Sequence, residues 1–314
     1  MQLIRPDTHI DFIGKRKIAM SISGVLLLLS VGLLIFKGLN FGIDFTGGTL
    51  VEIKFNQAPA IADVRNSLKP AGYSQAIIQE YGTPDEILIR VQNKKNEESS
   101  TISTAVLDAL TARFGADDVQ MRRVEFVGPQ VGDELTRAGI MAVLIAMLAI
   151  LIYVTFRFEL RFALGADAAL LHDVTMVLGV FALTGKEFSL PVVAALLTVI
   201  GYSLNDTIVV FDRIRENLAA NRKKKKPDDE ATLVNASINQ TLARTLMTSL
   251  TTLLVVAALF FLGGEVIHGF ALALMTGIIV GTYSSIYIAS PIMMSLHGRF
   301  KPSDEEIRKL EAKP

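Results

Sequence analysis

Six apolar runs, each long enough to cross a lipid bilayer, determine what this chain can fold into. They lie at Ile18–Phe36, Ala138–Phe156, Phe162–Thr184, Phe188–Phe211, Thr245–Gly264 and Gly269–Leu296. A transmembrane helix needs about 20 predominantly apolar residues. Hydrophobic residues make up only 51% of the chain, so their concentration in blocks, rather than their total, assigns the class. The sequence therefore predicts an α-helical polytopic membrane protein with six transmembrane helices.

Positive charges orient these helices in the membrane. A basic stretch, Lys15–Lys17, precedes the first run, which we interpret as an uncleaved first helix rather than a signal peptide. If the N-terminus is cytoplasmic, Lys186 is the one Lys or Arg residue in the two short external loops. The other Lys and Arg residues of the short connections then lie on the cytoplasmic side, as the positive-inside rule expects. Both termini are therefore expected in the cytoplasm. The predicted division is a cytoplasmic N-terminus at 1–17, the first helix at 18–36, an external domain at 37–137, the other five helices at 138–296 with a cytoplasmic loop at 213–244, and a cytoplasmic tail at 297–314.

The polar insert at 37–137 has about a hundred residues, enough for a compact domain. Its pattern predicts strands at Thr49–Phe55, Gln75–Tyr81, Glu86–Gln92 and Val119–Val127, helices at Ile61–Leu68 and Ser99–Phe114, and a turn at Gly82–Asp85. This order, β-α-β-β-α-β, is that of the ferredoxin-like split unit. The insert shows neither a nucleophile–base pattern nor a metal-ligand cluster. We interpret it as a binding or mechanical domain.

Polar residues inside two of the apolar runs are the candidate functional residues. Asp167, His172 and Asp173 lie in the third run and Asp206 in the fourth. A charge at membrane depth costs at least ~2.5–3.5 kcal/mol, so an intramembrane carboxylate indicates a functional site. Asp173 falls near the bilayer midplane, and Asp206 about 8 Å inside the cytoplasmic boundary, at a depth similar to that of Arg244. An ion pair with Arg244 would hold Asp206 ionised, and its loss to a dry surrounding would let Asp206 take a proton.

Each of these residues also has a simpler explanation. Arg244 could extend along the helix to the membrane interface, and Asp167, one turn inside the boundary, could be an interfacial residue. His172 and Asp173 could join neighbouring helices through hydrogen bonds. Asp206 is the residue that packing alone explains least well.

Glycines and charges outside the apolar runs permit further predictions. Gly42, Gly47 and Gly48 follow the first run, and we interpret them as a tight membrane-exit turn and a candidate hinge. A phosphate cradle would need a helix after the Gly-Gly pair, whereas a strand is predicted there. The basic run Lys223–Lys226 indicates orientation or an attraction to anionic membrane lipid, not nucleic-acid binding.

Small residues recur along the sixth run. Gly277, Gly281, Ser284 and Ser285 have the spacing of one helix face. Close packing between helices is the first explanation of such a face. Contact with a partner subunit is the alternative.

Four segments of this sequence resemble a known family. Phe41–Gly48 is similar to the segment after the first span of SecF proteins, and His172–Val174 matches in the third span. Gly201–Asn217, which reads GYSLNDTIVVFDRIREN, is the most specific match, and Thr241–Thr245 is similar to the family's entry into the fifth span. The resemblance covers nearly the whole chain. Asp167 is a departure from the family's pattern.

The resemblance implies a function as well as a fold. It implies the resistance-nodulation-division superfamily, a complex with SecD, and assistance to the SecYEG channel in exporting preproteins across the bacterial inner membrane. The proton motive force would drive this export, and the domain at 37–137 would be periplasmic. The family implies that Asp206 and Arg244 act in proton coupling, and we add Asp173, His172 and Asn205 as candidates.

Two other functions fit the same residues. One is a proton-driven exporter of small molecules or lipid from the same superfamily, of which this chain would form one six-helix half. The other is a membrane scaffold in which the carboxylates only pack helices. The chain has no cysteine and four histidines, so we expect no disulfide, no metal site and no cofactor. No pattern suggests a hydrolytic or redox enzyme, and we expect a protein without enzymatic activity.

Overall fold

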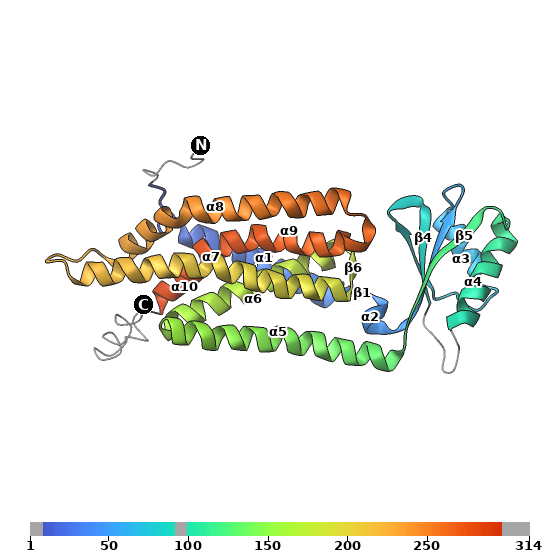
Figure 1. The fold of residues 1–314 in the computed structure, drawn as a ribbon, viewed down its shortest axis with the longest axis horizontal. Coiled ribbons are helices and arrows are strands. Elements are labelled where there is room, and N and C mark those ends of the chain that lie inside the picture. Colours follow the sequence, from blue (N-terminus) through green and yellow to red (C-terminus); the bar gives the residue numbers. More distant parts are fainter. Residues whose placement is uncertain (1–8, 92–98, 297–314) are drawn as a thin grey trace.

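The computed structural model describes residues 9–91 and 99–296. A bundle of long helices and a small α/β domain lie one after the other along the long axis of the molecule (Figure 1). We call the end of the bundle next to this domain the domain end, and the opposite end the far end. The predicted tail at 297–314 lies outside the described residues, as do residues 1–8 of the predicted N-terminal segment.

Six helices in the described part are long and apolar enough to cross a membrane, as the apolar runs predict. Because their composition satisfies the length and hydropathy that a bilayer demands, the class of multi-pass membrane protein is confirmed. They are α1 (Arg16–Phe36), α5 (Pro129–Arg157), α6 (Leu160–Thr184), α7 (Leu190–Arg222), α8 (Glu230–Leu262), and a last helix made of α9 (Glu265–Ser284), a π-helical segment (Ser285–Ala289) and α10 (Ser290–Ser295).

Three of these helices extend well beyond their apolar runs. Helix α5 begins at Pro129, nine residues before the predicted span. The predicted cytoplasmic connection at 213–244 is largely helical, because α7 continues to Arg222 and α8 begins at Glu230. Polar helix formers such as Glu and Arg end an apolar run without ending a helix. Asp229 then caps α8 by accepting a hydrogen bond from the Thr232 amide at 3.2 Å.

The helices differ in how much of their surface the chain itself covers. Helices α6 and α7 lie at the centre of the bundle, and a larger share of their apolar stretch is buried than in the other spans. Helices α1, α5 and α8 present apolar side chains outward, among them Leu28 at 75%, Phe156 at 75% and Leu262 at 85% exposure. Such faces are suited to contact with lipid or with another membrane subunit.

Two apolar clusters fill the bundle, one near each end. The far cluster gathers around Phe158, Phe162 and Phe211, and the other gathers around Phe181 and Val199 near the domain end. Along α6, α7 and α9, a short stretch between the two clusters is polar instead. This polar layer holds the candidate site.

The α/β domain comprises β2 (Gly48–Phe55), α3 (Ile61–Leu68), β3 (Ile77–Tyr81), β4 (Thr83–Val91), α4 (Ser99–Phe114) and β5 (Val119–Val127). These are the predicted elements in the predicted order. The strands form one antiparallel sheet in the order β3-β4-β2-β5. The predicted turn at Gly82–Asp85 is wrong, because Gly82 alone, at φ +72°, reverses the chain and β4 already begins at Thr83.

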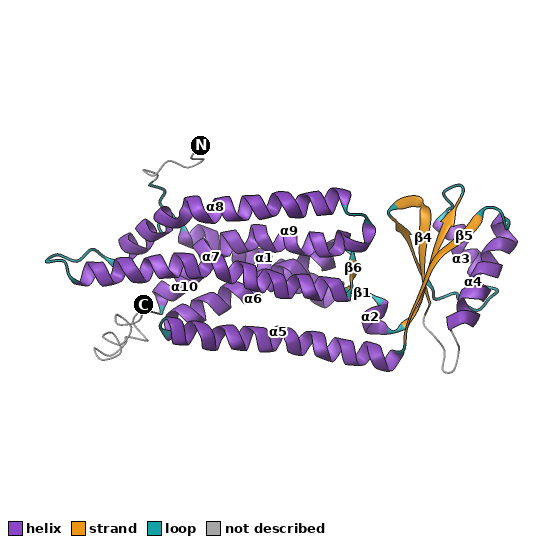
Figure 2. Ribbon diagram, viewed as in Figure 1, coloured by secondary structure: helices purple, strands orange, loops and turns teal. Residues whose placement is uncertain are grey.

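The two faces of this sheet have different neighbours. Val51, Ile53, Ile87 and Ile89 alternate along β2 and β4 and pack under α3 and α4. Figure 2 shows both helices on the side of the sheet away from the bundle. The other face of the sheet lies toward the bundle in Figure 2. Leu50 and Leu88 of the sheet pack with Ile43.

Short elements that the sequence does not predict join the domain to the bundle. They are β1 (Asn40–Phe41), α2 (Ile43–Thr46) and β6 (Glu187–Phe188). Strand β1 pairs in parallel with β6, so the segment after α1 lies beside the connection between α6 and α7. The predicted start of the fourth span at Phe188 is therefore two residues too early, because Phe188 is in β6 and α7 begins at Leu190.

Candidate functional site

Asp173 on α6 is enclosed in the middle of the bundle. Its side chain is 1% exposed. Two hydroxyls from other helices donate to its Oδ2: Ser203 of α7 at 2.5 Å and Ser284 of α9 at 2.8 Å. Three helices therefore meet at one carboxylate.

His172, the preceding residue, completes this group. Its Nδ1 lies 2.9 Å from Oδ1 of Asp173, and its Nε2 is buried and has no hydrogen-bond partner within the described residues. The imidazole ring lies 6.4 Å from the ring of Tyr283, which donates to the carbonyl of Ala19 on α1 at 2.8 Å. A histidine that shares a proton with a buried carboxylate can take part in proton transfer as well as in packing.

Asp206 on α7 has a separate set of hydroxyl partners. It is 2% exposed. Ser249 of α8 donates to its Oδ2 at 3.1 Å, and Thr248 approaches Oδ1 at 3.5 Å. Thr282 of α9 donates in turn to Ser249 at 2.7 Å. Asp206 thus links α7 to α8 directly and to α9 through Ser249.

The two carboxylates form one polar layer that α9 connects. Thr282 and Ser284 lie two residues apart on α9, one beside each carboxylate group. Among the described residues, neither aspartate has a lysine or arginine within ion-pair distance. Hydroxyls donate hydrogen bonds to a buried carboxylate but supply no opposite charge. The π-helical segment begins immediately after Ser284, and such segments frequently occur at functional sites.

The structure does not bring all the predicted residues together. Arg244 is exposed and, within the described part of the chain, is not at ion-pair distance from Asp206, although it is near enough for its charge to act on that carboxylate. Asn205 is exposed as well, because consecutive residues point about 100° apart around a helix and Asp206 faces inward. Asp167 is partly buried, and its Oδ1 lacks a partner among the described residues. The site is therefore made of Asp173, His172 and Asp206.

Hydroxyl residues are the part of the site that sequence reasoning missed. Ser203, Ser249 and Thr282 are small residues in apolar runs, where Ser and Thr are common and bond to their own helix backbone. In the sequence, Arg161 serves only as one of the positive charges that orient the helices. In the structure it is 1% exposed and forms ion pairs with Glu159 at 2.8 Å and with Glu230 at 2.7 Å. It fastens the far end of α6 to the start of α8.

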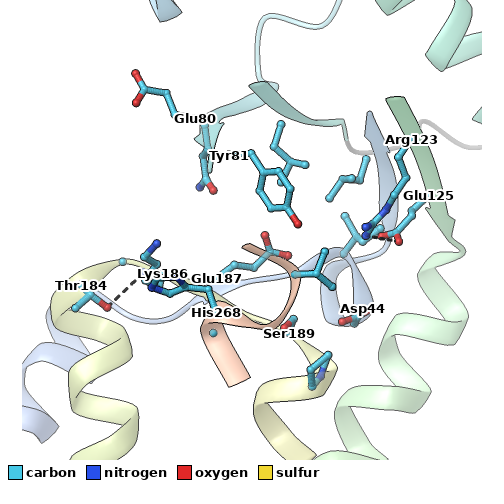
Figure 3. A pocket seen from close by; sticks show the side chains of 18 residues that line it. Asp44, Glu80, Tyr81, Arg123, Glu125, Thr184, Lys186, Glu187, Ser189 and His268 are labelled. Atoms are coloured by element: carbon cyan, nitrogen blue, oxygen red, sulfur yellow. Dashed lines mark hydrogen bonds and ion pairs between the residues drawn. The ribbon is translucent and has the colours of Figure 1, made fainter. Parts of the chain in front are cut away.

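A cavity of about 410 Å³ lies between the α/β domain and the domain end of the bundle (Figure 3). The domain contributes Tyr81, Arg123 and Glu125 to its wall, and the bundle contributes Lys186, Glu187 and His268. Within the described residues there is no group of three or more His, Asp or Glu side chains that could hold a metal ion. The cavity lies at the joint between two parts of the molecule and is lined by polar and apolar side chains alike.

The glycines predicted as a hinge lie at this joint in close contacts. A Cβ on Gly47, which has φ +65°, would come within 2.9 Å of the Pro129 Cα, and a Cβ on Gly42 within 2.6 Å of the Glu187 Oε1. Gly48 opens β2 with φ +129°. Glycine is favoured at Gly47 and Gly48 by backbone conformation, whereas a Cβ on Gly42 would only displace the end of the Glu187 side chain. Hinge motion at these three residues stays a prediction.

Fold and site together define a multi-pass membrane protein with one α/β domain and a buried acidic layer in its helices. A model of the SecD/SecF protein-export membrane protein, C-terminal, matches residues 106–299, and one of the SecD/SecF GG motif matches residues 32–59. The chain belongs to the SecD/SecF family of protein-export membrane proteins.

Relatives and solved structures agree with this assignment. The chain is 55% identical over 94% of its length to a protein translocase subunit SecF from Magnetococcus marinus, of which it covers 94%. It is 47% identical over 98% of its length to one from Desulfurispirillum indicum, of which it covers 97%. A crystal structure of SecDF, a translocon-associated membrane protein from a Thermus species, matches 95% of the chain at 40% identity with a TM-score of 0.84. The chain spans only 40% of that SecDF chain.

Proposed function

We propose that this chain acts as the SecF-type subunit of the Sec translocase accessory complex and, with SecD, uses the proton motive force to promote protein export. The observation that carries this proposal is the pair of buried carboxylates, Asp173 and Asp206, held by hydroxyls in the middle of a membrane bundle. Intramembrane carboxylates of this kind are typical of proton pathways. The preprotein would pass through SecYEG, and the chain itself would have no enzymatic activity.

Asp206 is the proposed proton switch. In the present arrangement it is bonded to hydroxyls of Ser249 and Thr248. Thr248 also donates to the carbonyl of Arg244, one turn away on α8 at 3.1 Å. A rotation of α8 or of the arginine side chain would exchange the hydroxyls for a guanidinium, which favours the ionised carboxylate. Asp173 and His172 would respond through α9, which touches both carboxylate groups.

The proposed orientation follows the distribution of positive charge. The far end of the bundle and both termini would be cytoplasmic, and the α/β domain would lie in the periplasm of a bacterial inner membrane. The strand order β3-β4-β2-β5, with both helices on one face, supports the ferredoxin-like class for this domain. A position outside the membrane suits a domain that contacts an emerging chain.

SecD is the proposed partner for the uncovered helix faces. The related SecDF protein is much longer than this chain, which covers 40% of it. Leu28 and Phe156 are exposed on α1 and α5. In a membrane, such apolar side chains are covered by lipid or by the helices of a second subunit. Membrane lipid would cover the remaining faces.

The test is the variant Asp206→Asn, which keeps the shape of the side chain but cannot titrate. We expect normal insertion and loss of the gradient-stimulated part of preprotein translocation into inverted membrane vesicles. Asp167→Asn is the matched control, because it also removes an intramembrane carboxylate but lies outside the polar layer. Full gradient stimulation in Asp206→Asn would overturn the proposal.

A further inference from the structure

The face of the sheet that lies toward the bundle carries one buried charge, Arg90 of β4. Its side chain is 5% exposed. Its Nη2 forms an ion pair with Oε2 of Glu187 at 2.6 Å, and its Nη1 donates to the carbonyl of Phe41 at 2.8 Å. Arg90 therefore bridges the α/β domain to both strands of the small β1–β6 pair. A buried arginine has few replacements that keep such a planar fork.

Glu187 belongs to the connection between α6 and α7, the two helices that carry Asp173 and Asp206. Burial raises the pKa of Glu187, with nearby Asp44 adding to the rise and the Arg90 guanidinium acting against it. The side chain of Glu187 is 27% exposed, and the nearby cation favours its charged form. Removal of Glu187 would leave the guanidinium of Arg90, which is 5% exposed, without an opposite charge, which is costly.

Three further contacts clamp this connection to the base of the domain. Oδ2 of Asp44 accepts a hydrogen bond from the amide of Leu190, the first residue of α7, at 2.7 Å. The amide of Gly42 donates to the carbonyl of Phe188 at 2.9 Å. The Asn40 side chain donates to the carbonyl of Gly185 at 3.0 Å. The connection cannot shift without moving the residues to which the domain is attached.

We propose that the Arg90–Glu187 ion pair is the strut that makes the α/β domain follow α6 and α7. Arg90 and Glu187 act as positioning residues, which hold the sheet above the domain end and set the width of the cavity beside them. The functional consequence rests on the proposed proton-driven export, since a change at Asp173 or Asp206 would reach the domain through this connection. Coupling between distant sites requires such a shared element.

A cross-linking experiment tests the strut without any export assay. The chain has no cysteine, so Gln79→Cys in β3 and Ser189→Cys before α7 place two unique thiols on facing walls of the cavity. A short bis-maleimide cross-links the two cysteines when the α/β domain is fixed in place above the bundle. We expect Arg90→Gln and Glu187→Gln each to lower the cross-linked fraction roughly tenfold, and the double variant to lower it no further than Arg90→Gln alone, because the ion pair is already lost in that variant.

Lys54→Gln is the matched control. Lys54 lies on the same face of the sheet, and its ion pairs with Asp85 and Glu86 stay within the domain. Unchanged cross-linking in Arg90→Gln or Glu187→Gln, or additive losses in the double variant, would overturn the strut. The assay needs no proton gradient, so its outcome is independent of Asp206→Asn. Loss of gradient-stimulated export in Glu187→Gln at normal protein level is the expected functional counterpart.

Discussion

Asp173 shows how a single buried residue can fasten several helices. Ser203 and Ser284 donate to the same oxygen from two different helices, so the carboxylate keeps one donor when the other is lost. Hydrogen bonds between membrane helices contribute about 0.6 kcal/mol on average, and up to about 1.7 kcal/mol. A carboxylate with two short contacts should lie toward the upper part of that range.

We predict that Ser203→Ala and Ser284→Ala each lower the stability of the membrane part by about 1 kcal/mol. The double variant should lose more than the sum of the two, since it leaves Oδ2 of Asp173 without a hydroxyl donor. Thermal unfolding in mild detergent measures this. Ser295→Ala is the control, because Ser295 is exposed and bonds only to its own helix. Strictly additive losses would mean that the two serines do not share one acceptor.

At the scale of elements, α7 and α9 lie in close contact along a seam of small residues. A Cβ on Gly277 would come within 2.2 Å of a Val199 methyl group, and one on Gly281 within 3.0 Å of the Ser203 Cβ. The small-residue face of the last helix therefore packs against α7 of the same chain. This approach is what lets Ser284 and Thr282 reach the carboxylate layer.

Gly277→Ala should lower stability by about 1–3 kcal/mol, the usual cost of overpacking. Val199→Ala in the same chain should recover part of the loss, because it removes the methyl groups that clash. Gly201→Ala on α7 is the control: its Cβ would meet nothing within 4 Å, and alanine favours the helix. Detergent unfolding temperatures compare the three variants. Equal losses in Gly277→Ala and Gly201→Ala would contradict the packing argument.

Elements with a periodic pattern could be predicted from the sequence, whereas contacts between elements could not. Helix α3 and strand β5 have their predicted bounds because alternation and nearby Pro or Gly residues define them. Strands β1 and β6 have two residues each, too short for any period. The carboxylates of Asp173 and Asp206 stood out in apolar runs, but their serine partners look like any small helix residue. Only the tertiary packing of α7, α8 and α9 brings these serines next to the carboxylates.

At the scale of the whole molecule, one short connection meets both proposed functional parts. Helices α6 and α7 carry the carboxylate layer, and residues 185–190 between them hold the base of the α/β domain through Glu187 and Leu190. A rearrangement in the membrane therefore has a direct mechanical route to the domain. Gly42 lies beside the same connection, since a Cβ there would meet the end of the Glu187 side chain.

Replacement of residues 49–127 by a short Gly/Ser linker should leave the membrane part inserted and abolish export. Gly48 and Val127 are paired at the base of the sheet, so the two ends are neighbours and a short linker closes the gap without strain. The domain has its own apolar core of Val51, Ile53 and their neighbours, which makes it a separate folding unit.

Export of a reporter protein in cells measures the outcome, and an immunoblot of membranes checks the level of the chain. The same linker inserted between Gly115 and Asp118, in the turn that joins α4 to β5, is the control, because it adds equal length at an exposed site and keeps the domain. That insertion should export normally. Normal export by the truncated chain would mean that the carboxylate layer works without the domain, and it would favour a purely structural role for the α/β part. Loss of export in the truncated chain, but not in the insertion control, would mean that the α/β domain is needed for export, as the proposed proton-driven movement requires.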